Sequence, residues 1–413
     1  MPVNAYFQHF AKKNVKNINK HVILSLIQFT SGGVARAELA RQLGLSRSAV
    51  TTIVSDLMAN GTIQESAKKT GTSGRPRTLL EIRPKAGYVA GIDMGAKHLR
   101  ISIANFGAQV LSEKEIPFDI SEKPNLCIKK ADVLLKELLS EAGLRFPQLK
   151  AIGLGVPGPI SSDAGMVIAP PIMPGWDQFP IRKTLEDLWA IPVSVNNDAE
   201  LGALGEWAYG AGRDANDLAY IKVGTGIGAG LLIDGQIYRG STGAAGEIGH
   251  LTIDVDGPIC TCGNRGCLEA LSGGGAIAGQ ARDAVKKQSY TALANIAFDD
   301  ISAKSVAKAA QRGDLVSQKI MEKAGESLGI ALAGLVNIFN PDMIVVGGGV
   351  AQNGDLFLEP IRKTVEERSL PAATTNLRIT AALLGKRSSS TGAIVQALSV
   401  ALHAVGEAKK KDR

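Results

Sequence analysis

Aromatic residues, cysteines and long apolar runs are all scarce in this chain of 413 residues. Aromatics make up 5% of it, and three of its four cysteines lie within residues 260–267. Such clustering does not fit a disulfide framework and excludes the small disulfide-rich secreted class. No uninterrupted apolar segment is long enough to span a bilayer, and the N-terminal segment lacks the apolar core of a signal peptide. We therefore expect a cytoplasmic protein with no membrane partner.

Positive charge is abundant, but only in the first fifth of the chain. Residues 1–85 contain 13 Lys and Arg against 4 Asp and Glu, whereas the remainder contains 33 against 35. The net charge of +7 therefore originates in the N-terminal segment. A basic segment attached to a near-neutral body indicates a polyanionic partner, with a solvated charged surface as the alternative on charge alone.

A helix-turn-helix pattern lies in this basic segment. Leu39, Ala40 and Leu43 form the apolar face of a short helix. Gly44 ends that helix, since a residue without Cβ adopts the left-handed cap conformation at low cost. Ser46 is a suitable N-cap for the next helix. The buried face of the second helix is predicted to consist of Val50, Ile53, Val54 and Leu57. An arbitrary pair of amphipathic helices is the alternative.

The exposed face of the second helix suits DNA binding, because its short polar side chains can lie against base edges. The predicted contacts from this face are Arg47, Ser48, Thr51 and Thr52. Two strands then flank a basic, Gly-rich tip, as in a winged helix. In that tip Arg75 and Arg77 flank a proline, and their guanidinium groups can enter a narrow minor groove. We predict that residues 1–84 are a winged helix-turn-helix DNA-binding domain.

The remainder of the chain has a duplicated α/β pattern. Three strand-like runs from "YVAGIDMG" onward predict a meander, and a helical stretch and a buried strand follow them. The second half repeats this order, beginning at "LAYIKVGTGIGAGLLIDGQIY". Two similar halves predict a ribonuclease-H-like fold of the actin and hexokinase type. We expect a first lobe over 85–198, completed by a C-terminal helix at 390–408, and a second lobe over 199–389.

Several segments make the chain similar to the ROK family, which groups bacterial repressors, uncharacterised reading frames and sugar kinases. These segments are "GVPGP" (155–159), "NNDAELGALGE" (196–206), "VGTGIGAGL" (223–231), "GEIGHLTIDVDGPICTCGNRGCLE" (246–269) and "IVVGGGV" (344–350). With its N-terminal module, the chain resembles the repressor branch, of the xylose- and N-acetylglucosamine-responsive kind. The resemblance implies a sugar-responsive repressor of carbohydrate uptake and catabolism genes.

Four potential metal ligands lie close together in the sequence. His250, Cys260, Cys262 and Cys267 have the spacing H-x9-C-x-C-x4-C. One imidazole and three thiolates match a closed tetrahedral zinc site, with no open position for water. We therefore predict a structural zinc ion and no hydrolytic activity. Reduced structural cysteines are the alternative, and Cys127, alone in a helical pattern, is expected to be a buried small hydrophobe.

The resemblance also implies a sugar site. In the family an Asn-Asp pair, an E-x-G-H motif and a Glu after the last zinc cysteine face the hexose. On this sequence they fall on Asn197, Asp198, Glu247, His250 and Glu269. Carboxylates and amides of this kind can bond adjacent sugar hydroxyls. His250 would serve both the zinc and the sugar.

The first phosphate loop departs from the sugar-kinase pattern. Asp198 matches the general base of the kinases, but Ala96 and Lys97 replace the glycine and hydroxyl residue expected near ATP phosphates. We interpret Asp198 as a vestigial base and the body as a non-enzymatic sugar sensor. Lys97 could still pair with phosphate, so a residual sugar kinase remains an alternative.

The predicted mechanism is a two-state switch. A homodimer, or a dimer of dimers, would place two recognition helices on an inverted-repeat operator. Sugar binding would change the lobe angle, and the linker at 83–88 would transmit this change to the winged helices. Control by a protein partner in place of a sugar is the second alternative.

Overall fold

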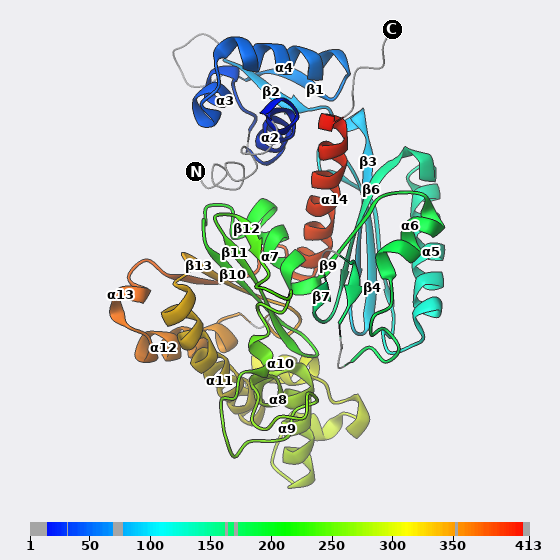
Figure 1. Cartoon of the computed structure of the whole chain (residues 1–413). Helices are drawn as coiled ribbons and strands as arrows, with labels where there is room; N and C mark the ends of the chain where they lie inside the picture. The colour runs from blue at the N-terminus through cyan, green and yellow to red at the C-terminus, as the bar shows by residue number, and fades with distance from the viewer. Residues whose placement is uncertain are drawn as a thin grey trace.

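The computed structural model describes residues 15–30, 32–68, 77–161, 164–168, 172–351 and 354–407. A small N-terminal module lies at one end of the molecule, and two α/β lobes follow it (Figure 1). Within the described ranges, the helices are all too short or too polar to cross a membrane. The predicted fold class, a winged helix-turn-helix followed by a two-lobed α/β body, is confirmed.

The N-terminal module contains three helices and a two-stranded wing. Its elements are α2 (Val15–Phe29), α3 (Arg36–Leu43), α4 (Arg47–Ala59), β1 (Ile63–Lys68) and β2 (Arg77–Ile82). Gly44 ends α3 in the left-handed region at φ 63°, and Ser46 Oγ accepts a 3.2 Å hydrogen bond from the Ala49 N–H to begin α4. All four residues predicted for the buried face of α4 are buried. The predicted pattern and both of its caps are therefore confirmed.

The first lobe is built on a five-stranded sheet. Its elements are β3 (Tyr88–Met94), β4 (His98–Asn105), β5 (Val110–Pro117), α5 (Pro124–Glu141), β6 (Leu149–Val156), β7 (Ile160–Ser161), β8 (Met166–Val167), α6 (Ile181–Trp189) and β9 (Val193–Asn197). The strand order is β5-β4-β3-β6-β9, with an antiparallel meander followed by two parallel additions. Side chains of α5 and α6 share one apolar core with this sheet, and the predicted burial of Cys127 there is confirmed.

The second lobe repeats this topology. Its strands are β10 (Leu218–Val223), β11 (Ile227–Ile233), β12 (Gln236–Tyr238), β13 (Met343–Gly347) and β14 (Arg378–Ala381). Their order, β12-β11-β10-β13-β14, has the same pairing directions as the first sheet. The covering helices are α8 (Leu268–Ser272), α9 (Gly274–Lys286), α10 (Ala303–Gln311), α11 (Leu315–Phe339), α12 (Asp355–Arg368) and α13 (Pro371–Thr374). The repeat read from the sequence is therefore a repeat of sheet topology.

Two helices join the lobes, α7 (Asp198–Tyr209) and α14 (Ser388–Glu407). They pack against each other, α14 also against β3 and β6, and α7 also against β10 and β11. Their backbones touch, because a Cβ on Gly205 would lie 2.2 Å from the carbonyl oxygen of Ser388. A Cβ on Gly392 would lie 1.7 Å from the carbonyl oxygen of Leu201. Only glycine permits so close a crossing at these two positions.

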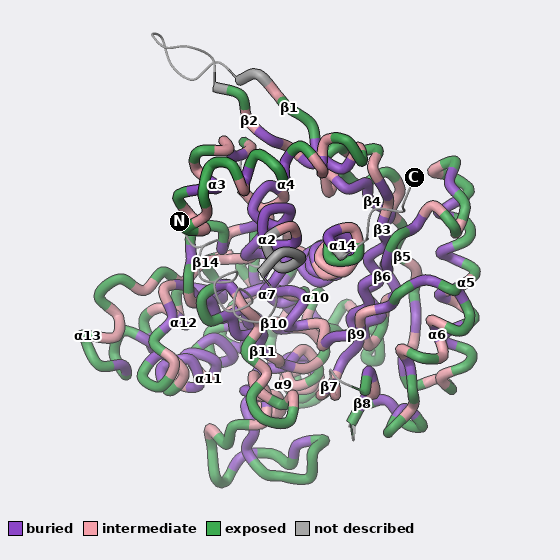
Figure 2. Tube along the Cα trace, turned by 45° about the horizontal axis from the view of Figure 1, so that its top comes forward, coloured by how far each residue is buried: buried purple, intermediate pink, exposed green. Residues whose placement is uncertain are grey.

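The N-terminal module is packed onto the body. Helix α14 contacts α2, and the two lie side by side in Figures 1 and 2. Buried residues of α2 and α4 share one apolar cluster with Phe106, directly after β4, and with Ile394 and Leu398 on α14. The connecting segment predicted at 83–88 contains the short 3₁₀ turn Pro84–Ala86. The N-terminal module therefore contacts the body through a packed apolar interface as well as through this segment.

Candidate functional site

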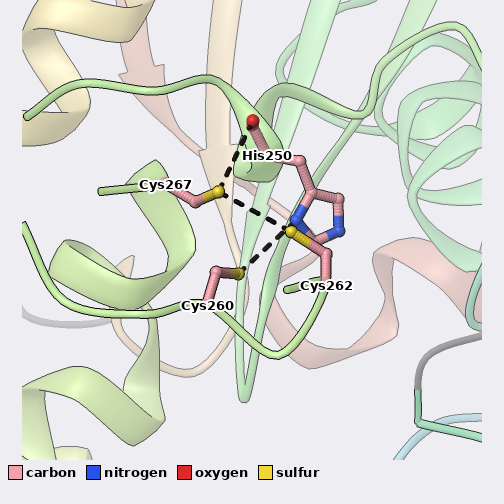
Figure 3. Close-up of side chains that lie close together, drawn as sticks. All are labelled: His250, Cys260, Cys262 and Cys267. Atoms are coloured by element: carbon pink, nitrogen blue, oxygen red, sulfur yellow. Dashed lines mark hydrogen bonds between the residues drawn. The ribbon is translucent and has the colours of Figure 1, made fainter. Parts of the chain in front are cut away.

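The four predicted metal ligands lie together in the second lobe (Figure 3). The ligand atoms of His250, Cys260, Cys262 and Cys267 are all within 4.8 Å of one another, and the cysteines are free thiols. The Sγ atoms of Cys262 and Cys267 are 3.7 Å apart, as are Cys260 Sγ and His250 Nδ1. A tetrahedron with metal–sulfur bonds of about 2.3 Å has edges of about 3.8 Å. The arrangement can therefore hold a metal ion.

Glycine shapes the loop that contains the predicted metal ligands. Gly266 has φ 67°, and a Cβ there would lie 1.5 Å from the carbonyl oxygen of Asp254. The Gly266 carbonyl accepts a 2.8 Å hydrogen bond from the Ile253 N–H. The end of the loop therefore lies beside the segment with which it begins. Gly263, at φ 89°, forms the other tight turn. Residues with a Cβ would be strained at both turns, so the cysteine spacing depends on these glycines.

The start of α7 positions two of the predicted sugar residues. Asn197 caps the helix, because its Oδ1 accepts hydrogen bonds from the N–H groups of Ala199 (2.7 Å) and Glu200 (3.3 Å). Its Nδ2 donates to the carbonyl of Gly158 at 3.0 Å. Asp198 is the first residue of α7 and forms a 2.8 Å ion pair with Lys222. The side-chain amide of Asn197 is therefore already hydrogen-bonded to the backbone at both of its polar atoms. The carboxylate of Asp198 is paired with a lysine of the second-lobe sheet.

The remaining carboxylates approach from the second lobe. Glu269 accepts hydrogen bonds from the Ile227 N–H at 3.0 Å and from Thr261 Oγ1 at 3.3 Å. Burial raises the pKa of Glu247 above its ordinary value, nearby His250 opposes this, and Asp198 and Glu269 raise it further. Glu247 is therefore close enough to His250, Asp198 and Glu269 for their charges to affect it. We call Asn197, Asp198, Lys222, Glu247 and Glu269 the inter-lobe cluster.

Sequence reasoning missed the cations of this region. Lys222 is the one charged residue in the strand "LAYIKV", a signal that could have identified it. Arg239 forms a 3.3 Å ion pair with Glu200 and donates a 2.8 Å hydrogen bond to Asn196 Oδ1. Burial raises the pKa of Glu200 above its ordinary value, and Arg239 opposes this. Such pairs join separate strands and helices, so spacing along the chain does not reveal them.

The segment interpreted from the sequence as an altered phosphate loop forms a closed turn between β3 and β4. The Gly95 N–H donates a 2.9 Å hydrogen bond to the His98 carbonyl. Lys97 forms a 2.6 Å ion pair with Asp119, and its side chain is 66% exposed. His98 Nε2 lies 3.1 Å from Asp93 Oδ2. The Lys97 ammonium is therefore paired with a carboxylate at the surface, and His98 contacts the carboxylate of Asp93.

The predicted DNA-binding residues lie at the N-terminal end of the molecule. Arg47, Ser48, Thr51 and Thr52 are all exposed on α4, opposite its buried face. Thr51 and Thr52 donate hydrogen bonds to the carbonyls one turn earlier, at 2.8 Å and 3.1 Å. Arg75 lies outside the described residues. Arg77 begins β2, and its side chain is also outside the description. These contacts stay predictions.

Comparison with known proteins matches both parts of the chain. A family model described as ROK family matches residues 89–399, and one for winged helix-turn-helix DNA-binding matches residues 17–64. The xylose repressor of Caldicellulosiruptor bescii is 32% identical over 392 residues, covering 93% of this chain and 96% of that protein. A solved ROK family transcriptional regulator, a homolog of the E. coli Mlc protein, is 27% identical with a TM-score of 0.81, over 95% of this chain and 98% of its own. A Streptomyces griseus ROK family glucokinase, solved with glucose and AMPPNP, is 28% identical with a TM-score of 0.68, over 75% of this chain and 99% of its own.

Proposed function

This chain belongs to the ROK family, and from that premise we propose that it is a sugar-responsive transcriptional repressor of carbohydrate genes. One observation carries the proposal. Helix α7 begins at the inter-lobe cluster, with Asp198, and ends at Tyr209, which contacts α2 of the DNA-binding module. A relative named xylose repressor spans both parts of the chain, which supports the same function and favours a sugar effector.

We propose that the exposed face of α4 contacts the operator. Arg47, Ser48, Thr51 and Thr52 present one guanidinium and three hydroxyl groups, which can bond base edges or phosphates. A homodimer with this geometry reads an inverted repeat, because two-fold symmetry of the protein is mirrored in its site. The basic tip that contains Arg75 and Arg77 would add minor-groove contacts.

We propose that the sugar lies against Asp198, Glu247, His250 and Glu269. Half-buried carboxylates next to one another are costly without a partner, and sugar hydroxyls can donate hydrogen bonds to them. The raised pKa of Glu247, caused first by burial, is consistent with a carboxylate that gains donors when ligand enters. Asn197 would hold the start of α7 in place.

The metal is proposed to be a structural zinc ion. Three thiolates and one imidazole are the donors that zinc prefers in closed sites, and they leave no position for a reacting water. The ion would hold together the segment between Glu247 and Glu269, so that both carboxylates face the same space. Zinc would therefore contribute to sugar binding through position only.

Transmission to the DNA-binding module is proposed to follow α7 and α14. Phe29 of α2 packs near Trp207 and Tyr209 of α7, with ring centroids 6.3 Å and 6.4 Å away. Gly406 of α14 lies against the backbone of His21 of α2. A sugar that binds one lobe arrangement more tightly shifts the equilibrium toward it, and these contacts couple the shift to α2.

A residual sugar kinase is the second candidate, because a glucokinase shares the body fold. The phosphate loop favours the repressor. Ala96 adds a Cβ where phosphate would approach, and the Lys97 ammonium is paired with Asp119. A repressor controlled by a protein partner is the third candidate, and the retained carboxylates of the inter-lobe cluster favour a sugar instead.

Calorimetric titration of the zinc-loaded protein with pentoses, hexoses and N-acetylated sugars tests the proposal. Each titration is repeated with ATP and magnesium. We expect saturable binding of one sugar, release of operator DNA at the same concentration and no ADP. ADP formation would support the kinase, and the absence of any sugar response would support a protein partner.

A further inference from the structure

Lys222 is a charged residue in a strand that is otherwise apolar. It lies on β10 in the second-lobe sheet, and its flanking residues Ile221 and Val223 are both buried. Its Nζ lies 2.8 Å from Oδ2 of Asp198, and the two side chains are 19% and 13% exposed. A nearly buried ammonium is stable only beside a negative partner, so the ion pair is part of how this strand folds.

A second carboxylate, from the first-lobe sheet, lies in the same region. Asp93 pairs with Gly155 of β6, and a Cβ on Gly155 would lie 3.6 Å from Cα of Asp198. Asp93 is the last residue but one of β3, which is buried from Val89 to Met94, and its side chain is 2% exposed. Its Oδ2 lies 3.1 Å from His98 Nε2, whereas Oδ1 has no hydrogen-bond partner among the described residues. Burial by itself would raise the pKa of Asp93, but Lys222, His98 and Arg100 together hold it below the ordinary value. The carboxylate is therefore ionised.

Lys222 is the cation that these two carboxylates share. Burial opposes the charged form, yet Asp198 and then Asp93 raise the pKa of Lys222 above its ordinary value. Arg100 is not available as a substitute, because Glu113 and Glu115 already pair with its guanidinium. One ammonium against two carboxylates leaves the group of Lys222, Asp198 and Asp93 with a net negative charge.

We propose that the Lys222 ammonium takes the place of a divalent cation at Asp93 and Asp198. Two carboxylates converging from separate elements are the protein ligands that magnesium commonly uses together with substrate phosphates. A tethered ammonium supplies charge but has no vacant coordination position for a phosphate oxygen. The remaining negative charge also repels a nucleotide. Lys222 therefore makes the site specific for an uncharged sugar and excludes a metal–phosphate ligand.

The inference deepens the proposed function, on which it rests, and it adds a mechanical role. Lys222 belongs to the second-lobe sheet, whereas Asp93 belongs to the first. The attraction between the Lys222 ammonium and the Asp93 carboxylate therefore acts from one lobe to the other. A sugar hydroxyl that donates to Asp198 competes with Lys222 for the same oxygen, which gives the sugar a direct effect on this link.

The test is manganese binding by full-length, zinc-loaded protein, with free Mn²⁺ followed by electron paramagnetic resonance. Lys222→Met is expected to bind one Mn²⁺ per chain at least roughly tenfold more tightly than wild type, because two adjacent carboxylates lose their counter-ion. Adding Asp93→Asn to Lys222→Met is expected to abolish the gain. Lys183→Met is the matched control, because it removes the same charge from an exposed ion pair on α6.

Lys222→Gln provides a second variant if Lys222→Met does not fold, because its amide still donates to Asp198 without a charge. The proposal is overturned if a folded Lys222 variant binds Mn²⁺ no more tightly than wild type. It is equally overturned if wild type binds a Mn²⁺ ion that Asp93→Asn removes. Neither sugar nor DNA enters the experiment, so failure of the proposed function would be seen separately in the sugar titrations.

Discussion

Tyr209, the last residue of α7, accepts a 3.0 Å hydrogen bond on its phenolic oxygen from Nε2 of Gln28 on α2. The first residue of the same helix, Asp198, forms the ion pair with Lys222. Twelve residues at about 1.5 Å each make α7 roughly 18 Å long. One rigid helix therefore extends from the inter-lobe cluster to the DNA-binding module.

Tyr209→Phe is expected to weaken the coupling between sugar and operator. The variant keeps the ring that packs near Phe29 but loses the hydrogen bond from Gln28, a loss of about 1 kcal/mol. We expect the change in operator affinity at saturating sugar to shrink roughly fivefold, with sugar affinity within about twofold of wild type. Fluorescence anisotropy with labelled operator, with and without sugar, measures the first quantity. Tyr238→Phe, at an exposed position, is the control, and an unchanged sugar response in Tyr209→Phe would argue against α7 as the route.

Glu247→Gln is expected to lower sugar affinity by roughly 10- to 100-fold, because a charge-assisted hydrogen bond is lost. Glu326→Gln, an exposed substitution on α11, is the matched control.

Burial is the main cause of the raised pKa of Glu247 in the free protein. Acidification therefore protonates Glu247 at a higher pH than an ordinary glutamate. If the sugar binds the ionised form, affinity falls as pH falls through that raised pKa, and the glutamine variant lacks this part of the pH dependence. Calorimetry from pH 7.5 downward measures it, and parallel profiles for both proteins would exclude Glu247 from the site.

Cys262→Ser is expected to reduce the metal content below one zinc per chain and to lower the melting temperature. The reason is that a closed site loses one of its four ligands. Sugar affinity is expected to fall with it, since Glu247 and Glu269 flank the metal loop. Cys127→Ala is the control, because Cys127 is buried in the first lobe, away from the cluster. Elemental analysis of the purified chains gives the stoichiometry, and full zinc content in Cys262→Ser would contradict the assigned ligand set.

Glu206→Gln is expected to destabilise the protein by about 3 kcal/mol or more, because an amide offers one acceptor oxygen where a buried carboxylate uses two. Glu206 is fully buried on α7. It accepts hydrogen bonds from the N–H groups of Leu383 (3.1 Å) and Leu384 (3.0 Å) and from Ser388 Oγ (2.7 Å). These bonds hold the start of α14 against α7. Urea unfolding measures the effect against Glu367→Gln on the exposed face of α12, and equal stability of the two variants would refute this role.

Much of the architecture could be read from the sequence because it depends on local rules. Gly44 and Ser46 mark a helix end and a helix start by their backbone and side-chain chemistry, and both act as predicted. The close spacing of His250 and three cysteines brings four ligand atoms together through short loops. The family resemblance is confirmed across both parts of the chain. The domain boundaries and the individual sugar and DNA contacts stay predictions.

Tertiary structure alone decided how these parts are connected. The pairs Lys222–Asp198, Arg239–Glu200 and Gln28–Tyr209 each join residues on different elements. Helix α14 packs against α2, although the two helices lie far apart in the sequence. The sequence predicted only a covalent connection between the N-terminal module and the body, at 83–88, and did not predict this contact. A sequence determines which faces are apolar and where helices begin. Which of those faces meet is determined by the packing of α7 and α14 against each other and against the two sheets. Apolar contact is non-directional, so many pairings would satisfy the same pattern.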